Sequence, residues 1–119
     1  MKRMYDLPVS EPWYSYIKSG VKSVEGRKKS PTWDKLQKGD YLKIKNNGEW
    51  FYAEIVNITV YDGSVDNLGN YFKGESLERT LPGIKTLTEA KNVYMTPPVS
   101  WTEEEIKKYG VMALQLRVV

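Results

Sequence analysis

The sequence of 119 residues contains neither cysteine nor histidine. Without cysteine, the chain has no disulfide framework and no thiol nucleophile. Without histidine, it has no Ser-His-Asp triad, no histidine-ligated zinc and no imidazole acid–base catalyst. A general base must therefore be a carboxylate, a lysine or a tyrosine, and a metal site would need oxygen ligands throughout.

Long hydrophobic runs and nucleotide-cofactor motifs are missing as well. No apolar segment approaches the roughly 20 residues that span a bilayer, which excludes a transmembrane helix. Residues 1–10 lack the apolar stretch of a secretory signal. The chain also has no Walker A motif and no glycine-rich dinucleotide fingerprint. We therefore expect a cytoplasmic protein that has no membrane contact, no cofactor and no metal.

Positive charge is concentrated in the first third of the chain. Residues 1–40 contain nine Lys or Arg and five Asp or Glu, a net charge of +4, whereas residues 41–119 contain nine and ten, a net charge of −1. A basic first third favours an anionic partner, with nucleic acid as the leading candidate. On charge alone, a merely soluble basic protein is an equally good interpretation.

The elements expected from the sequence form a mixed order of strands and helices. The chain has no internal repeat, low-complexity tract or flexible linker, so we expect one domain over residues 1–119. Aromatic and β-branched segments predict strands at residues 4–9, 22–27, 41–45, 50–61 and 111–119. Helical spacing and end signals predict helices at residues 11–19, 65–78, 86–94 and 103–109. This order predicts an α+β fold, a small curled sheet or open barrel with helices at its rims.

Local signals mark where several of these elements begin and end. Asn46-Asn47-Gly48 between two strand segments predicts a tight hairpin. Ser10 is expected to cap the first helix, and Thr86 and Thr102 are each followed three residues later by a glutamate, which predicts capping boxes. The acidic run Glu103–Glu105 then complements the positive end of a helix dipole and is not a metal site.

Most of the chemical information lies in Gly20–Arg27, which has the sequence GVKSVEGR. On a strand, alternation puts Glu25 and Arg27 on one face and Val24, the expected core anchor, on the other. Glu25 and Arg27 are close enough to pair, and Lys22 stands at the mouth of the strand, where its side chain can reach a cleft. A carboxylate can accept from a base amino group, and Arg or Lys can hold a phosphate or a carbonyl. The alternative is an exposed ion pair on a strand.

The spacing Gly20-x-Lys22-x-x-Glu25-x-Arg27 resembles the GxKxxExR signature of ASCH domains, which are relatives of the PUA fold. The resemblance continues in order through residues 12–18, 38–40, 53–59, 81–83, 89–94 and 109–116. It therefore covers most of the chain and implies a PUA-like small curled β-barrel with a cleft beside the signature strand.

The resemblance implies that the partner is RNA or a modified nucleotide. Lys22 and Glu25 would then contact the base or ribose, and the basic run that starts at Arg27 would hold phosphate. Trp33 follows this run and would offer a stacking surface, or else it packs on the edge of the barrel. The expected nucleic-acid-binding residues are Lys22, Glu25, Arg27, Lys28, Lys29 and Trp33.

The resemblance also implies an enzymatic alternative. One bacterial branch of the family hydrolyses N4-acetylcytidine with a lysine, a threonine three residues later and a downstream glutamate, and some members are described as ribonucleases. Lys22 matches that lysine, Glu25 stands in place of the threonine, and the downstream glutamate would be Glu75 or Glu78. A small hydrolase of a modified nucleoside or of RNA would use Lys22 and Glu25 as its catalytic pair. A third hypothesis is an adaptor that binds a peptide in the same cleft.

Trp13 and Tyr16 are expected to pack in the core. Together with Ile17 they follow the i, i+3, i+4 spacing of one helical face. Large aromatic residues at such spacing are usually buried. We therefore assign them to the hydrophobic core and not to a binding site.

Overall fold

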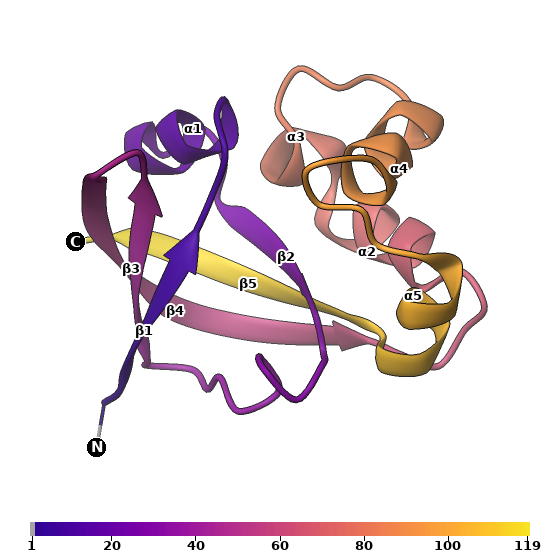
Figure 1. The fold of residues 1–119 in the computed structure, drawn as a ribbon, viewed down its shortest axis with the longest axis horizontal. Helices are drawn as coiled ribbons and strands as arrows, with labels where there is room; N and C mark the ends of the chain where they lie inside the picture. Colours follow the sequence, from indigo (N-terminus) through magenta and orange to yellow (C-terminus); the bar gives the residue numbers. More distant parts are fainter. Residues whose placement is uncertain (1) are drawn as a thin grey trace.

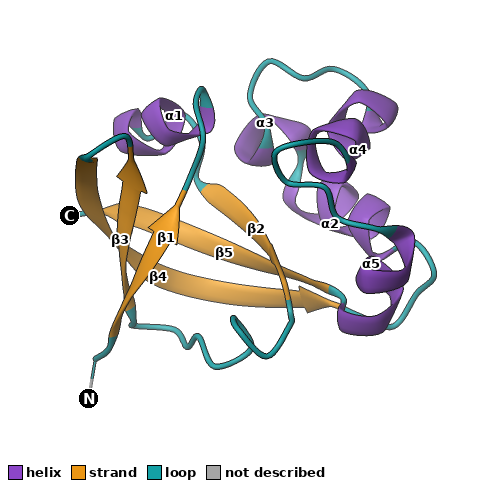
Figure 2. Ribbon diagram, viewed as in Figure 1, coloured by secondary structure: helices purple, strands orange, loops and turns teal. Residues whose placement is uncertain are grey.

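The structure is a computed structural model that describes residues 2–119 (Figure 1). Its strands are β1 (Met4–Pro8), β2 (Val24–Lys28), β3 (Tyr41–Asn46), β4 (Glu49–Tyr61) and β5 (Val111–Val118). Its helices are α1 (Trp13–Ser19), α2 (Asn67–Glu75), α3 (Leu77–Thr80), α4 (Leu87–Met95) and α5 (Glu103–Tyr109). The strands form one side of the molecule, and helices α2 to α5 gather on the other (Figure 2). The predicted α+β class is confirmed.

The five strands form one curled sheet in the order β1-β3-β4-β5-β2. Only β1 and β3 pair in parallel; the other neighbours are antiparallel. A register shift between Ile55 and Asn57 in the long strand β4 provides the irregularity at which such sheets bend. The two edge strands then approach each other, and the Arg27 guanidinium donates to the carbonyl of Pro8 over 3.0 Å. The sheet is therefore a half-barrel, as the expected curled barrel requires.

Local chemistry explains the elements that the sequence predicts well. Asn47 and Gly48 have φ of 47° and 82°, which is the pair of positive angles that a two-residue hairpin turn needs. Thr102 accepts from the backbone of Glu105, whose side chain accepts from the Thr102 backbone, so the capping box of α5 is complete. Thr86 likewise accepts from the Glu89 backbone at the start of α4.

The start of the first helix differs from the prediction. Ser10 is not its cap: α1 begins at Trp13, Pro12 occupies the cap position, and no side chain caps it. Glu11 instead accepts hydrogen bonds from the backbone and the hydroxyl of Ser15, at 2.9 Å and 2.6 Å. Glu11, which the sequence pattern places inside the helix, thus lies before it and accepts from one of the backbone N–H groups of the first turn, that of Ser15.

The helix predicted at residues 65–78 is two helices, α2 and α3. Ser76 separates them because its backbone has a φ of 76°, which a continuous helix does not contain. Its hydroxyl then caps α3 by accepting from the backbone N–H of Arg79. The break turns α3 toward β2, whose preceding residue Ser23 donates its backbone N–H to the Arg79 carbonyl.

The hydrophobic core has two parts. One fills the half-barrel, and the other lies between β2, β5 and helices α2 to α5. The buried residues of α1 are Tyr14 and Ile17, which confirms the core position of Ile17. Trp13 and Tyr16 are only half-buried, so the fully buried aromatic residue of the helix is Tyr14, which the helical spacing does not single out. Trp13 packs against both parts of the core because α1 lies where they meet. Within residues 2–119, every helix is too short or too polar to cross a membrane.

Candidate functional site

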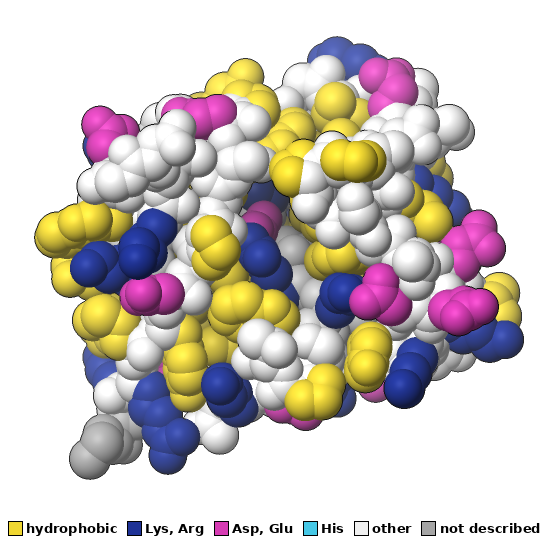
Figure 3. Space-filling model, in the orientation of Figure 1, with side chains coloured by type: hydrophobic (Ala, Val, Ile, Leu, Met, Phe, Trp, Pro, Cys, Tyr) yellow, Lys and Arg dark blue, Asp and Glu magenta, His cyan; other side chains and the backbone are white. Residues whose placement is uncertain are grey.

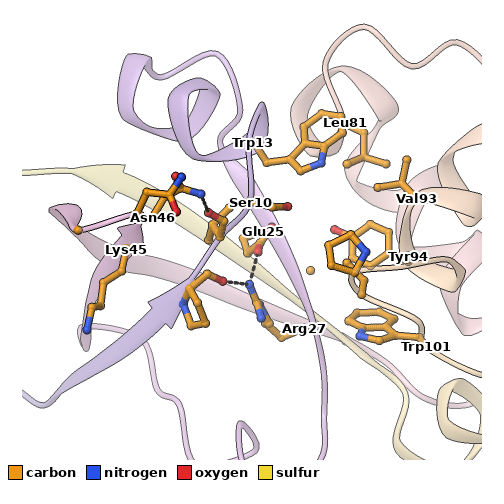
Figure 4. Close-up of a pocket in the computed structure, with 17 residues that line it drawn as sticks. Ser10, Trp13, Glu25, Arg27, Lys45, Asn46, Leu81, Val93, Tyr94 and Trp101 are labelled. Carbon is orange, nitrogen blue, oxygen red and sulfur yellow. Dashed lines mark hydrogen bonds and ion pairs between the residues drawn. The ribbon is translucent and has the colours of Figure 1, made fainter.

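A pocket of about 610 Å³ lies between the curled sheet and the helical side of the molecule. The space-filling view shows it as a central hollow, and the close-up shows the side chains around it (Figure 3, Figure 4). Glu25 and Arg27 of β2 form a polar wall. Tyr94 of α4 and Trp101, just before α5, form an aromatic wall opposite them, and Trp13 of α1 closes one end.

Glu25 is a buried carboxylate that has two cationic neighbours. Its residue is 6 % exposed. One carboxylate oxygen lies 3.2 Å from the Lys22 ammonium, and the other accepts from the Arg27 guanidinium over 2.7 Å. Burial alone would raise the pKa of Glu25, but the charges of Lys22 and Arg27 outweigh burial and hold the pKa below its ordinary value of 4.5. At neutral pH the pocket therefore contains an ionised hydrogen-bond acceptor.

Lys22 contacts this carboxylate from the buried side of β2. Its side chain is fully buried. The ammonium donates to the carbonyl of Val24 over 2.5 Å and to the carbonyl of Thr80, and it faces Glu25. An ammonium has three donors, so these three partners use all of them. Burial lowers the pKa of Lys22, and the attraction of Glu25 opposes that shift. The sequence places Lys22 at the mouth of a cleft; the structure instead makes it a buried link between β2 and the end of α3.

Arg27 has unused donors on the pocket side of β2. One terminal nitrogen donates both to Glu25 and to the Pro8 carbonyl. The guanidinium carbon lies 5.6 Å from the ring centre of Trp33, within cation–π range. Among residues 2–119, the Arg27 Nε atom has no hydrogen-bond partner although it is buried. Arg27 is thus fixed in orientation while most of its five N–H donors remain free.

Gly26 allows the helical side to pack directly on β2. A Cβ atom at this position would lie 2.8 Å from the ring of Tyr71, closer than real side chains approach. Tyr71 of α2 is fully buried and makes an edge-on contact with Tyr94, at 6.3 Å between ring centres. The glycine of the signature therefore leaves room for the ring of Tyr71 against β2. Tyr71 in turn contacts Tyr94, which belongs to the aromatic wall of the pocket.

The aromatic wall is a packed pair of rings. The centres of Tyr94 and Trp101 lie 4.7 Å apart, with their planes tilted by 49°. Both residues are buried, at 6 % and 7 % exposed. Burial, followed by the charge of Glu25, raises the pKa of Tyr94 well above its ordinary value, so the phenol stays protonated. This wall therefore offers flat apolar surface opposite the charged wall.

The profile of the ASCH domain matches residues 7–118 of the chain, which includes every strand and helix except the first residues of β1. The chain belongs to the ASCH domain family.

Two solved structures resemble this ASCH domain along its whole length. The crystal structure of the hypothetical protein PH0355 has a TM-score of 0.84 and 26 % sequence identity, and the match covers 98 % of this chain and 99 % of that one. The NMR structure of protein PF0455 from Pyrococcus furiosus has a TM-score of 0.75 and 27 % identity, and the match covers 98 % and 97 % of the two chains. No curated protein matches the sequence significantly.

The two lysines that follow Arg27 in the ASCH domain form ion pairs, and the Lys28 ammonium also lies 6.0 Å from the centre of the Trp101 ring. The Lys28 ammonium pairs with Glu105 over 2.6 Å, and the Lys29 ammonium lies 3.9 Å from Asp62. Neither lysine is among the residues that line the pocket. The structure therefore brings Lys22, Glu25 and Arg27 together and separates the two expected phosphate-binding lysines from them.

Trp33 and the two candidate glutamates also lie outside the pocket of the ASCH domain. Trp33 is half-buried, packs against the core of the half-barrel and braces Arg27. Glu75 accepts from the Tyr61 hydroxyl and lies 3.6 Å from Arg79, and Glu78 is exposed.

Sequence reasoning misses the aromatic wall of the pocket. Trp13 carries a helical spacing that indicates core, and Trp101 stands in a loop without any pattern. Tyr94 lies near the end of α4, and the spacing of apolar residues in this helix predicts only which side of the helix is buried. The one signal that bears on them is the resemblance over residues 89–94, which places this segment in the family without assigning it a role.

Proposed function

We propose that this ASCH domain binds RNA or a modified nucleotide by enclosing one base in the pocket beside β2. The observation that carries the proposal is the ionised, buried carboxylate of Glu25 facing an aromatic wall. The pocket volume, about 610 Å³, lies within the range of small-molecule sites, about 300–1,000 Å³. Family membership supports the proposal, because the ASCH fold is generally associated with RNA binding.

The polar wall selects a base that has a donor next to an acceptor. Glu25 is acceptor-only when ionised, so it pairs with an amino or ring N–H group. The free donors of Arg27 pair with a carbonyl, a ring nitrogen or a phosphate. Every base presents such a pair, but the order differs: cytosine has a donor, its amino group, at position 4 and an acceptor at N3, whereas uracil has an acceptor at position 4 and a donor at N3. Stacking against Trp101 or Trp13 would add about 1–3 kcal/mol per base.

Binding is better supported than hydrolysis. A catalytic lysine must reach the reacting atoms, and Lys22 is buried with all three donors engaged. The position where a hydroxyl nucleophile is expected holds Glu25, which both cations keep ionised. We therefore assign Lys22 a positioning role, in which it fixes Glu25 for the ligand.

A titration of the protein with nucleosides and single-stranded RNA tests the proposal. The ligands are cytidine, N4-acetylcytidine, uridine and a short cytidine-rich RNA, and binding is followed by tryptophan fluorescence and calorimetry. Cytidine is expected to bind more tightly than uridine, because a uracil ring in the same orientation would place its 4-carbonyl, an acceptor, against the ionised carboxylate of Glu25. Chromatography of the same mixtures checks for product: its formation would favour the hydrolase instead.

Glu25→Gln is the decisive variant, because an amide keeps the shape of the carboxylate and loses its charge. We expect the preference for cytidine over uridine to disappear. Glu104→Gln, on the exposed face of α5, is the control for general loss of negative charge. An unchanged preference in the Glu25→Gln variant would refute the assigned role of the carboxylate.

A further inference from the structure

The outer face of the sheet carries a row of side chains that starts at the pocket. The strand register aligns Pro8 with Lys45 across β1 and β3, and Lys45 with Trp50 across β3 and β4. All three residues are exposed, whereas the residue beside each of them along its strand faces the core. Pro8 and Lys45 also line the pocket. Because neighbouring strands lie roughly 4.8 Å apart, the row extends about 10 Å from Pro8 to Trp50, and Trp50 lies one strand beyond Lys45.

The row ends on an aromatic pair, the exposed Trp50 and the half-buried Tyr52. Trp50 is 50 % exposed, which is unusual for so large an apolar side chain. Its ring centre lies 5.3 Å from that of Tyr52, with the planes tilted by 57°. The Lys43 ammonium lies 4.5 Å from the centre of the Trp50 ring. We refer to Lys43, Lys45, Trp50 and Tyr52 as the outer hairpin surface.

Three lysines, Lys2, Lys43 and Lys45, lie near these rings, together with two carboxylates, Asp6 and Glu54. The Lys43 ammonium has no carboxylate within ion-pair distance among residues 2–119. Lys45 pairs with Asp6 over 3.3 Å, but both side chains are about half exposed, so water screens the pair. Lys2 contributes a further ammonium, which donates to the Tyr41 hydroxyl beside them. In the space-filling view, Lys and Arg side chains lie among hydrophobic ones on the side of β1 and β3, next to the central hollow (Figure 3).

We propose that the outer hairpin surface binds the nucleotides that flank a base held in the pocket, so that the ligand is a single-stranded RNA and not a free nucleotide. The inference rests on the proposed function. Accessible aromatic rings interleaved with lysine side chains are the combination that single-stranded nucleic acids recognise, because bases stack and phosphates pair at once. Lys45 belongs to both the pocket and the surface, and its side chain points away from Glu25 and Arg27 (Figure 4). It connects the two sites.

Parallel titrations with cytidine monophosphate and fluorescein-labelled hexacytidylate test this inference. Calorimetry measures the monomer, and fluorescence polarisation measures the hexamer at low and moderate salt. Trp50→Ala is expected to weaken hexamer binding roughly fivefold to a hundredfold, the range that the loss of one base–aromatic stack covers. Its affinity for the monomer should stay within about twofold of wild type, since Trp50 does not line the pocket.

Two further variants test the chemistry of the surface. Trp50→Phe keeps a flat ring and should retain most of the affinity for the hexamer. Lys43→Ala should weaken hexamer binding and reduce the slope of log affinity against log salt by about 0.7, the value for one phosphate contact on a single strand. The matched control is Lys107→Ala, which removes an exposed lysine on α5 and should weaken the hexamer less than Lys43→Ala does.

The outcomes separate this inference from the proposed function. Hexamer affinity that is unchanged in Trp50→Ala, or no tighter than monomer affinity in the wild type, would overturn the inference and leave the pocket assignment intact. Loss of hexamer affinity in Trp50→Ala together with no effect of Glu25→Gln would support the surface and refute the pocket. Equal weakening of monomer and hexamer by Trp50→Ala would also overturn it, because the residue would then act on the pocket.

Discussion

The two walls of the pocket are held in place by different forces. On the polar wall, each charged group is fixed by its partners: Lys22 by two carbonyls and Glu25, and Glu25 by two cations. On the aromatic wall, Tyr94 is fixed by packing against Tyr71 on one side and Trp101 on the other. Removing one partner from the polar wall leaves a buried charge, whereas removing a ring from the aromatic wall leaves a void. The first wall should therefore respond to pH and charge, and the second to volume.

The largest effect is expected from Lys22→Met, which keeps the length of the side chain and removes its charge. Glu25 would lose one of its two cations while still buried, a change that typically costs ~3–5 kcal/mol of stability. Urea unfolding followed by circular dichroism measures it. The double variant Lys22→Met/Glu25→Gln should recover part of the loss, because the uncompensated charge is gone. A single variant as stable as wild type would show that the polar wall is not held by charge.

Trp101→Ala is the matching change on the aromatic wall. A buried tryptophan reduced to alanine costs ~3–5 kcal/mol in general. We expect about 3 kcal/mol here, since one side of Trp101 already faces the open pocket. The same urea experiment measures it. Unlike the variants of Glu25, this variant should keep the pH dependence of the wild type; a changed dependence would mean that the two walls are coupled.

The pH dependence of stability follows from Glu25. Its pKa is lower in the folded protein than its ordinary value of 4.5, so its ionised form stabilises the fold. That contribution is complete above pH 4.5 and is lost as the pH falls through the lower, folded value. Comparing urea midpoints at pH 7 and about pH 3 should show a smaller decrease for Glu25→Gln than for wild type. Equal decreases would mean that other carboxyl groups carry the whole dependence.

The sequence predicts the parts of this molecule that local chemistry determines. The Asn47-Gly48 turn, the Thr102 capping box and the pairing of Glu25 with Arg27 all depend on residues within a few positions of each other. Lys22 is different, because its burial depends on the carbonyl of Thr80, which lies 58 residues away along the chain. The spacing of residues along the sequence gives no sign of this long-range contact.

The same reasoning applies to the errors in the helices and in the site. The break at Ser76 follows from packing of α3 beside β2, since serine itself does not favour a positive φ. Trp101 becomes a pocket residue only because the loop before α5 returns to α4, where the Trp101 backbone donates to the Tyr94 carbonyl over 2.8 Å. The polar wall could thus be predicted from the eight residues Gly20–Arg27, whereas the aromatic wall depends on contacts that form only when the chain folds.

The smallest effect is expected from Lys28→Ala, one residue beyond Arg27 on the same strand. The Lys28 ammonium pairs with Glu105 over 2.6 Å, but the two side chains are 22 % and 37 % exposed, so water screens the attraction. We expect a loss below about 1 kcal/mol, which should shrink further at high salt. The capping box of α5 stays intact, because Thr102 and Glu105 are both retained.

Nucleoside affinity should change little in Lys28→Ala, because Lys28 does not line the pocket and its ammonium lies 6.0 Å from the centre of the Trp101 ring, at the far end of cation–π range. Arg27→Ala provides the contrast: it removes a cation from Glu25 and the link to Pro8, so it should weaken cytidine binding and stability together. Calorimetry with cytidine and urea unfolding measure both quantities. If Lys28→Ala weakened cytidine binding as much as Arg27→Ala, the basic run would act as one phosphate-binding unit, and the polar wall would extend beyond the groups that Lys22 and Glu25 anchor.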